Sequence, residues 1–308
     1  MSPDNPMVEF FAQMGHKIIK SPSSWWYEVQ PGILFALPYY KQITPNKDEI
    51  DDLIKTAHLS AIRYPTTLNN LGFLSTVAIN CNRDYDFAHL HPKARNQTKR
   101  GLENCQIMPI DFNQLQREGL QLNIETSIRQ GRDSQNSSKD YWDKFCLTAS
   151  QTKGIHAWGS FYKNKLASFL VAVETENNWI EWIINHSSTS CRKYYSNNAL
   201  AFVVGQHYLR ERGVNGICYG LGSLEETDSL DHFKIRMGWT NLPIKQRLEY
   251  SLKYRIIAEI TPIWALRVAK LLYPKNYFVR KASAMILNYR QQTLTHKSET
   301  TCKESDTD

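Results

Sequence analysis

The chain has 308 residues, of which 42% are apolar and 22% charged, so it is long enough for two packed cores and has the balance of a globular protein. A net charge of +7 favours an anionic partner over a cationic one, without separating nucleic acid, nucleotide and membrane surface. The six cysteines have no paired spacing, which argues against a zinc motif or a disulfide framework and favours reduced thiols. With a polar N-terminus and no long apolar run, we expect a cytoplasmic protein.

The first third of the chain predicts a β-hairpin, a helix and a strand. Two apolar and aromatic runs flank a turn at Pro31-Gly32, as in a hairpin. Asn46 is a helix-capping residue followed by acidic residues, as at a helix N-terminus. The predicted elements are a hairpin within 23–45, a helix at 46–58 and a strand near 71–79.

Residues 89–149 are predicted to be mainly helical. Pro92 stands early in a segment with basic side chains, where a helix tolerates it. The predicted elements are a helix with one basic face at 89–104, a strand at 105–109 and helices at 111–129 and 139–149. The polar loop at 131–138 is the internal segment that we expect to be disordered.

From Gly154 the pattern changes to strands. Three runs at 155–162, 166–174 and 179–185 are separated by short turns, which is typical of an antiparallel meander. A helical period follows from Asn197 to Arg212 and ends at Gly213, and a short apolar strand at 216–219 comes after it. A short helical pattern at 228–238 contains Phe233-Lys234, and a last strand is expected around 247–250.

Residues 251–308 begin with a basic amphipathic region and end in a polar tail. Two interpretations of the region stay open: a helix pair that packs against the protein, or a basic amphipathic segment on an anionic membrane. We expect the tail from Gln291 to Asp308 to be disordered.

The order of these elements resembles the FemABX-like peptidoglycan aminoacyltransferases and related GNAT-like acyltransferases. The segments that carry the resemblance are Tyr85–Asn104, Trp158–Tyr162 with Leu166–Ser168, Asn197–Gly213, and Phe233-Lys234 with Gly238. Leu37-Pro38 and Ile43–Pro45 resemble the first half of such proteins, so the resemblance covers most of residues 23–250.

The resemblance implies an α+β fold with two GNAT-like halves, each a mixed sheet flanked by helices, plus C-terminal helices. We expect a degenerate first half at 1–110, an acyltransferase half at 111–250, and basic helices with a disordered tail at 251–308. It also implies an N-acyltransferase that acts on an amine of a sugar, amino acid or peptide in envelope or polysaccharide metabolism. The expected donor is an acyl-coenzyme A or an aminoacyl-tRNA. The phosphate-binding loop of GNAT enzymes is absent near Asn197, which argues against coenzyme A, and the basic charge of the chain favours aminoacyl-tRNA. An inactive scaffold at the inner face of the membrane is the non-enzymatic alternative.

Three residues are candidates for catalysis. The resemblance places Lys234 at the donor carbonyl, where a cation stabilises a tetrahedral oxyanion; the alternative is a surface lysine at a helix end. Glu181 lies in an apolar strand, where burial would make it a base, unless strand alternation points it at solvent. His186 is a possible proton acceptor or an ordinary loop residue.

Other residues are candidates for binding. Arg192 and Lys193 precede the helix that starts near Asn197. Together they form either a candidate phosphate site or a solvated basic loop. The candidates for contact with an acceptor are Arg95, Lys99, Tyr39 and Tyr40. The spacing of histidines, cysteines and acids predicts no metal site. The expected partners are an amine-bearing small molecule or envelope precursor, with tRNA and a membrane surface as further candidates.

Overall fold

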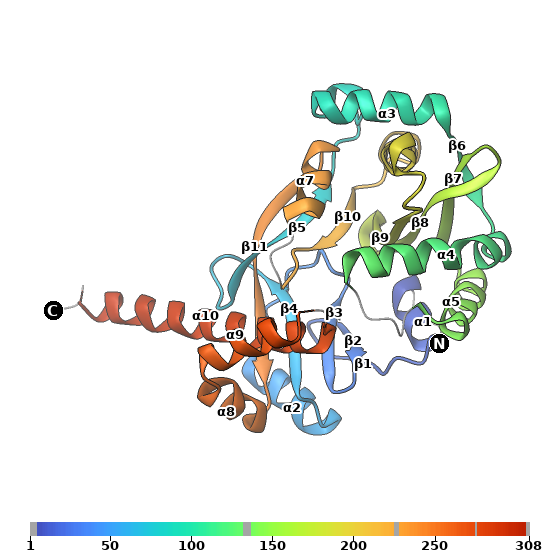
Figure 1. The fold of residues 1–308 in the computed structure, drawn as a ribbon. Coiled ribbons are helices and arrows are strands. Elements are labelled where there is room, and N and C mark those ends of the chain that lie inside the picture. The colour runs from blue at the N-terminus through green and yellow to red at the C-terminus, as the bar shows by residue number, and fades with distance from the viewer. Residues whose placement is uncertain (1–4, 132–136, 225–227, 275, 306–308) are drawn as a thin grey trace. The chain divides into compact units, whose positions relative to one another are not determined.

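The computed structural model describes residues 5–131, 137–224, 228–274 and 276–305, which form two compact units (Figure 1). The first unit comprises Met1–Gly15, Val77–Gly220 and Asp228–Asn241, and the second comprises His16–Thr76, Leu221–Thr227 and Leu242–Asp308. Each unit therefore collects segments that lie far apart in the sequence. The boundaries expected at residues 110 and 250 cut the chain into consecutive pieces, and they stay a prediction.

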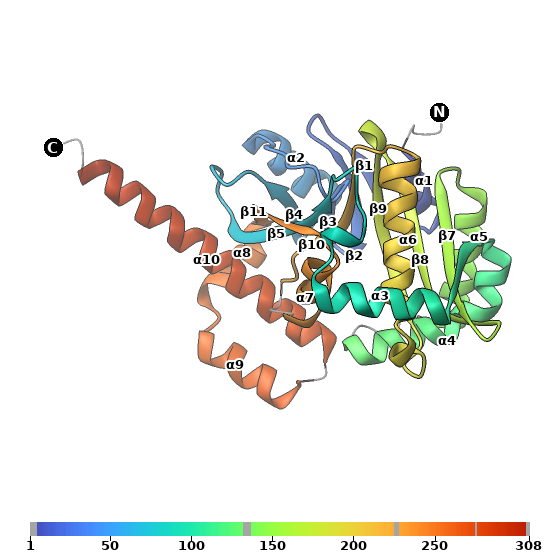
Figure 2. The same ribbon diagram turned by 90° about the horizontal axis from the view of Figure 1, so that it is seen from above.

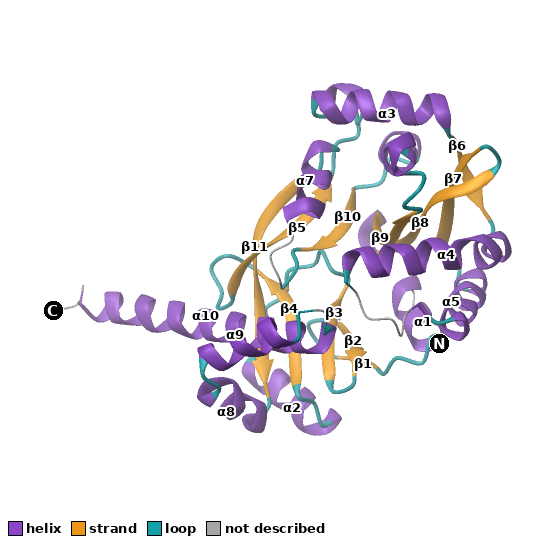
Figure 3. Cartoon of the chain, in the orientation of Figure 1, coloured by secondary structure: helices purple, strands orange, loops and turns teal. Residues whose placement is uncertain are grey.

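A mixed sheet forms the middle of the first unit (Figure 3). Its strands, in spatial order, are β10 (Gly216–Leu221), β9 (Trp179–Ser187), β8 (Lys165–Thr175), β7 (Ile155–Tyr162) and β6 (Gln106–Ile110). β6 to β9 are antiparallel neighbours, which confirms the predicted meander, and β9 is parallel to β10. A parallel pair needs a crossover, and α6 (Ser196–Gln206) with the π-helical turn His207–Glu211 supplies it.

Helices cover both faces of this sheet (Figures 1 and 2). On one face lie α3 (Pro92–Asn104), α6 and α7 (Asp228–Arg236), and on the other lie α1 (Pro6–Gln13), α4 (Phe112–Gln130) and α5 (Lys139–Gln151). Side chains of β8 and β9 such as Leu170 and Trp182 pack with α3 and α6, whereas Phe169 packs on Trp142 of α5. Gly101 lets α3 approach α6, because a Cβ there would lie 2.6 Å from the carbonyl oxygen of Tyr195.

The second unit repeats the same plan. Its strands, in spatial order, are β1 (Ile18–Lys20), β2 (Trp25–Gln30), β3 (Ile33–Leu37), β4 (Ala61–Thr66), β11 (Thr240–Tyr250) and β5 (Phe73–Asn80), of which β5 and β11 also have residues in the first unit. β2 and β3 form the predicted hairpin, and α2 (Lys47–Ala57) connects β3 to the parallel β4. An antiparallel pair, a helix and a parallel strand thus occur in both units, and the fold is α+β with two GNAT-like halves, as predicted.

The predicted start and end of α2 are confirmed by its caps. The Oδ1 atom of Asn46 accepts a hydrogen bond from the backbone N–H of Glu49 at 2.8 Å. His58 ends the helix in the left-handed conformation with φ of 54°, in the position that often follows a helix. Ile50 and Leu53 of this helix are buried against Trp26 and Leu34.

The C-terminal region is helical. After β11 come α8 (Leu252–Ile260), α9 (Ile263–Leu272) and α10 (Tyr277–Ser305). Helix α10 includes the tail from Gln291 to Ser305, since no glycine or proline interrupts residues 277–305 and a helix started on a packed segment propagates at little cost. The disorder expected for this tail stays a prediction. Residues 306–308, and most of the loop expected to be disordered at 131–138, lie outside the described residues.

Helix α1 was not predicted. Asn5 accepts hydrogen bonds from the N–H groups of Met7 and Val8, and Pro6 fills the first helical position. The Asn5-Pro6 pair, a capping residue followed by proline, is therefore the sequence pattern that could have predicted the start of α1. In the described part of the chain, none of the helices combines the length and hydropathy that crossing a membrane requires.

Candidate active site

The parallel strands β9 and β10 separate soon after they meet. They pair at three positions, ending with Glu181 opposite Cys218. Past this pair, β9 continues to Ser187 and β10 to Leu221, but the residues of these two described strands are no longer paired with each other. The opening is bounded by the C-terminal ends of two parallel strands, which is where α/β folds place ligands.

An aromatic cluster lies at this opening. The rings of Trp182, Tyr219 and Trp239 are mutual neighbours, with centroids 4.7 to 5.4 Å apart and edge-to-face geometry. Asn185 donates a hydrogen bond from its Nδ2 atom to the hydroxyl of Tyr219 at 2.7 Å. This bond bridges β9 and β10 where their backbones no longer pair. The four side chains therefore form one cluster where the two strands separate.

Lys234 of α7 joins this cluster as a buried cation. Its side chain is only 4% exposed, and its ammonium lies 5.4 Å from the centre of the Tyr219 ring and 3.5 Å from the carboxylate of Asp231. The surface-lysine alternative is therefore wrong. A buried ammonium is costly unless compensated, and here an aromatic face and a carboxylate accompany it.

The end of α7 fixes the position of Lys234. Its carbonyl oxygen accepts hydrogen bonds from the N–H groups of Met237 and Trp239, as expected where a helix closes around a left-handed residue. That residue is Gly238, with φ of 80°. Glycine is required there, because a Cβ would lie 2.8 Å from the carbonyl oxygen of His89.

Three buried polar atoms of the cluster have no hydrogen-bond partner among the described residues. They are Nε1 of Trp182, Nε1 of Trp239 and Oδ1 of Asn185. Buried polar atoms are nearly always satisfied in folded proteins, by the protein, by water or by a ligand. Two N–H donors beside a buried ammonium suit a ligand that carries oxygen acceptors. These residues were not named as candidates from the sequence, although two of them are neighbours of residues that were named: Trp182 follows Glu181, and Trp239 follows Gly238.

Glu181 is buried, which excludes the solvent-facing alternative. It is 1% exposed and opposite Cys218, which is fully buried. Burial raises the pKa of the Cys218 thiol well above its usual value; the negative charge of Glu181 adds to this rise and the positive charge of Lys234 opposes it. Both charges thus act on one thiol. Strand neighbours point to opposite faces, however, so Glu181 and Trp182 project to different sides of the sheet.

His186 lies away from Lys234. It is 5% exposed and belongs to β9 rather than to a loop, with its ring edge-to-face against Phe169 at 5.6 Å. Phe169 packs on α5, on the face opposite α6 and α7. Five residues also separate His186 from Glu181, a distance of about 15 Å along a strand. The structure therefore does not bring His186 together with Lys234.

The loop between β9 and α6 carries the predicted phosphate site. Arg192 and Lys193 are exposed in a short 3-10 turn directly before α6. The first turn of α6 has no side-chain cap, and within the described chain the buried Oγ of Ser196 and the Oδ1 of Asn197 have no hydrogen-bond partner. Uncapped N–H groups, a buried hydroxyl and two cations favour an anion here.

Helix α4 holds this loop in place. A carboxylate oxygen of Glu125 accepts a hydrogen bond from the backbone N–H of Thr189 at 2.6 Å and one from the hydroxyl of Ser188 at 3.2 Å. Although partial burial acts to raise the pKa of Glu125, these hydrogen bonds lower it below its usual value. Arg129, one turn further along α4, binds the carbonyl oxygen of Ser187.

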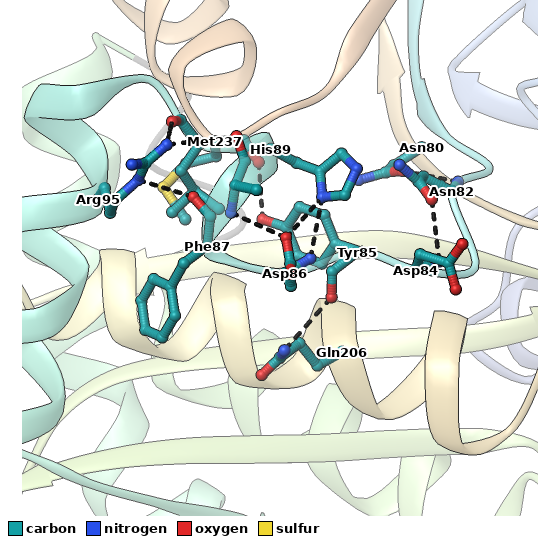
Figure 4. Close-up of polar contacts among 12 residues, drawn as sticks. Asn80, Asn82, Asp84, Tyr85, Asp86, Phe87, His89, Arg95, Gln206 and Met237 are labelled. Atoms are coloured by element: carbon teal, nitrogen blue, oxygen red, sulfur yellow. Dashed lines mark hydrogen bonds and ion pairs between the residues drawn. The ribbon is translucent and has the colours of Figure 1, made fainter.

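Arg95 has structural partners. Its guanidinium donates hydrogen bonds to the carbonyl oxygens of Phe87, Ala88 and Leu90, which hold the turn before α3 (Figure 4). An arginine engaged by three carbonyl oxygens has little capacity left for an anionic acceptor. Lys99 is exposed, with its ammonium 5.7 Å from the ring centre of Phe87.

Tyr39 and Tyr40 belong to the second unit and are half-buried after β3. The hydroxyl of Tyr39 bonds that of Tyr27 at 2.7 Å, and its ring lies edge-to-face on Phe35. Arg63 stacks on Phe35 in the same unit; burial lowers its pKa to about 10, while Tyr27 and Tyr39 act to raise it. The structure does not place these residues relative to Lys234.

Comparison with known proteins identifies the fold. No family model and no curated protein matches the sequence. Among solved structures, the chain is similar to FemX, with a TM-score of 0.55 and 11% identity over 83% of this chain and 93% of that one. It is also similar to the C-terminal DUF2156 domain of a protein described as a lysylphosphatidylglycerol synthetase from Agrobacterium fabrum, with a TM-score of 0.57 and 13% identity over 84% and 92% of the chains.

The chain has the FemABX-like, GNAT-type acyltransferase fold. L-PGS from Bacillus licheniformis shares it with a TM-score of 0.52 and 13% identity over 83% of this chain and 90% of that one. The resemblance seen in the sequence is thus confirmed at the level of the fold. In the described residues, no group of three or more His, Cys, Asp or Glu side chains is placed to hold a metal ion.

Proposed function

We propose that this protein is an N-acyltransferase that moves an acyl or aminoacyl group onto an amine at the opening between β9 and β10. The observation that carries the proposal is the buried Lys234 beside Tyr219, with the unpartnered indole N–H groups of Trp182 and Trp239 in the same cluster. These groups supply the positive charge and hydrogen-bond donors that acyl transfer requires around the developing oxyanion.

In the proposed reaction a neutral amine of the acceptor attacks the carbonyl carbon of the donor. The carbon–nitrogen bond forms, negative charge develops on the carbonyl oxygen near the Lys234 ammonium, and the bond to the leaving oxygen or sulfur of the donor then breaks. The amine loses one proton, and the leaving group gains one. Lys234 acts by charge and keeps its own proton throughout.

Two carboxylates are candidates for accepting the amine proton. Glu181 was expected from the sequence, and it is buried at the last pair of β9 and β10. Asp231 lies 3.5 Å from the Lys234 ammonium and is one-third exposed, so an incoming amine has easier access to it. We propose Asp231 as the proton acceptor, because Glu181 projects to the other side of the sheet from Trp182 and the cluster that contains Lys234.

The N-terminus of α6 is the proposed site for a phosphate of the donor. The hydroxyl of Ser196 can donate a hydrogen bond to a phosphate oxygen, and Arg192 and Lys193 supply positive charge. Both donors expected from the sequence, an acyl-coenzyme A and an aminoacyl-tRNA, carry phosphates that fit such a site. The acceptor that we propose is an amine of an envelope precursor, and the fold shared with FemX and with the domain of a lysylphosphatidylglycerol synthetase supports this choice.

Donor binding tests this function. We expect either acetyl-coenzyme A or aminoacylated tRNA to raise the melting temperature, because a ligand that binds only the folded state stabilises it. Replacing Arg192 and Lys193 by Ser should remove most of the shift, whereas the same change at Lys163 and Lys165, on the β7–β8 turn, should keep it. If neither donor shifts the melting temperature and neither supports transfer, the proposed enzyme function is wrong.

A further inference from the structure

The second unit presents an apolar surface on α8 and α9. Its side chains are Ile256, Ile260, Ile263, Trp264, Val268 and Leu271, which we call the α8–α9 surface. Ile260 is 71% exposed, Trp264 69% and Leu271 79%. Soluble proteins rarely expose contiguous patches of large apolar side chains without a function in binding.

The apolar side chains face away from the side on which the helices pack. Ala258 is the buried residue of α8 and Leu266 that of α9. Ile256 and Ile260 each lie two residues from Ala258, and two residues turn a helix by about 200°. Trp264 and Val268 have the same relation to Leu266. Both helices therefore direct their large apolar side chains outward.

The rest of the second unit holds these helices in a fixed arrangement. The guanidinium of Arg290, on α10, donates hydrogen bonds to the carbonyl oxygens of Ala258, Glu259 and Thr261 at 2.5 to 2.7 Å. These bonds satisfy the C-terminal end of α8 and fix the turn into α9. The side chain of Gln292 in turn bonds both the N–H and the carbonyl oxygen of Leu248 on β11. Helices α8 and α9, and the apolar side chains that they carry, are therefore held in a fixed position by α10 and β11.

Positive charge surrounds the apolar side chains. Within residues 252–272 the cations are Lys253, Arg255, Arg267 and Lys270, and the one acid is Glu259. The centres of protein–protein interfaces are depleted in charged residues, so a mixture of lysine, arginine and large apolar side chains does not suit a protein partner. It suits a bilayer, where apolar side chains enter the boundary of the acyl chains and cations meet anionic headgroups.

We propose that the α8–α9 surface docks on an anionic lipid bilayer, with Ile260, Trp264 and Leu271 inserted at the boundary between headgroups and acyl chains. Both helices then lie in the plane of the membrane, and their lysine and arginine side chains extend to the headgroups. Trp264 is suited to this depth, because its ring is apolar and its N–H is polar. The proposal concerns binding alone and is independent of catalysis.

Flotation of the full chain with lipid vesicles tests this proposal. Vesicles of phosphatidylcholine with phosphatidylglycerol should carry the protein, and vesicles of phosphatidylcholine alone should carry much less. Replacing Ile260, Trp264 and Leu271 together by Ser should lower the bound fraction at least about tenfold. The matched control replaces Leu74, Ile128 and Leu147, which are 69%, 76% and 57% exposed elsewhere, and should leave binding unchanged.

A second variant separates charge from apolar insertion. Replacing Arg255, Arg267 and Lys270 by Glu should abolish the preference for phosphatidylglycerol, and the binding of the unchanged protein should weaken with salt. Circular dichroism and melting temperature confirm that each variant is folded. Equal binding by the unchanged protein and the apolar variant contradicts the proposal. Failure of the unchanged protein to float also contradicts the proposal. If, in that case, light scattering shows that the unchanged protein is a dimer and the apolar variant is not, the α8–α9 surface is an interface between two copies of the chain instead.

Discussion

The hydroxyl of Tyr85 donates a hydrogen bond to the carbonyl oxygen of Met237 at 2.7 Å and so fastens the turn before α3 to the residues that end α7 (Figure 4). The same turn crowds Gly238, where a Cβ would lie 2.8 Å from the carbonyl oxygen of His89 and 3.2 Å from the Tyr85 ring. The position of Lys234, four residues earlier, therefore depends on a tight contact across the first unit.

Gly238→Ala is predicted to be strongly destabilising. Its φ of 80° already disfavours a side chain, and the clash with a backbone oxygen adds to this, for a combined loss of about 2–4 kcal/mol of unfolding free energy. Gly213→Ala is the control, since Gly213 has φ of 61° with nothing within 4 Å of its Cβ position, and should lose about 1 kcal/mol. Urea unfolding measures both, and equal losses would contradict the crowding at Gly238.

Cysteine alkylation is predicted to follow exposure and thiol pKa. Burial raises the pKa of Cys146 to about 12, and that of Cys218 well above its usual value, so neither forms a thiolate near neutral pH. Among the cysteines whose side chains the structure describes, Cys81 is exposed and Cys191 half-buried, and these should react first; partial burial raises the pKa of Cys81 as well. Iodoacetamide labelling with peptide mapping measures each site separately. Labelling of Cys218 in the native protein as fast as Cys81 would show that the opening between β9 and β10 is wrongly described.

Stability at acid pH is predicted to depend on Glu125. Its pKa is lowered in the folded state, so its contribution is present above pH 4.5, the unfolded value, and is lost as the pH falls through the folded pKa. Glu125→Gln should thus reduce the melting temperature by about 1–3 °C at pH 7 and by less at pH 3. Glu118→Gln is the control, because Glu118 bonds Gln114 of its own helix instead of the loop. A Glu125→Gln deficit that does not shrink at pH 3 would argue against this role.

Asp231→Asn and Glu181→Gln are predicted to differ in their effect on transfer. If Asp231 accepts the amine proton, its replacement should lower kcat by about 10²-fold. Glu181→Gln should leave kcat close to that of the unchanged protein and act mainly on stability, because it removes a buried charge. A loss of kcat in Glu181→Gln alone would restore Glu181 as the base.

Much of the fold could be predicted because its signals are local. Asn46 caps α2 with its own side chain, and the turns at Lys163 and Asn164 have the positive φ expected of a tight hairpin. The tail could not be predicted in the same way. Its residues are polar, but whether a helix continues there depends on the packing of the preceding part of α10 against β11.

The site could be predicted only in part. Lys234 was found through the family resemblance, which rests on the order of the preceding strands and helix as well as on the Phe-Lys pair and the closing Gly238. The aromatic cluster was not found, because Trp182, Tyr219 and Trp239 come from three elements and meet only when β9 and β10 separate. Arg95 was assigned to a substrate from its charge, yet its guanidinium binds carbonyl oxygens that are near it only in the folded turn.

The most direct test is the rate of acyl transfer by Lys234→Met, measured with whichever donor raises the melting temperature. Methionine keeps the length of the side chain and removes the charge, so kcat should fall by about 10²–10³-fold while the melting temperature changes little. Lys245→Met, at another buried lysine, is the matched control and should keep its activity. A Lys234→Met protein that transfers at the rate of the unchanged enzyme would contradict the account.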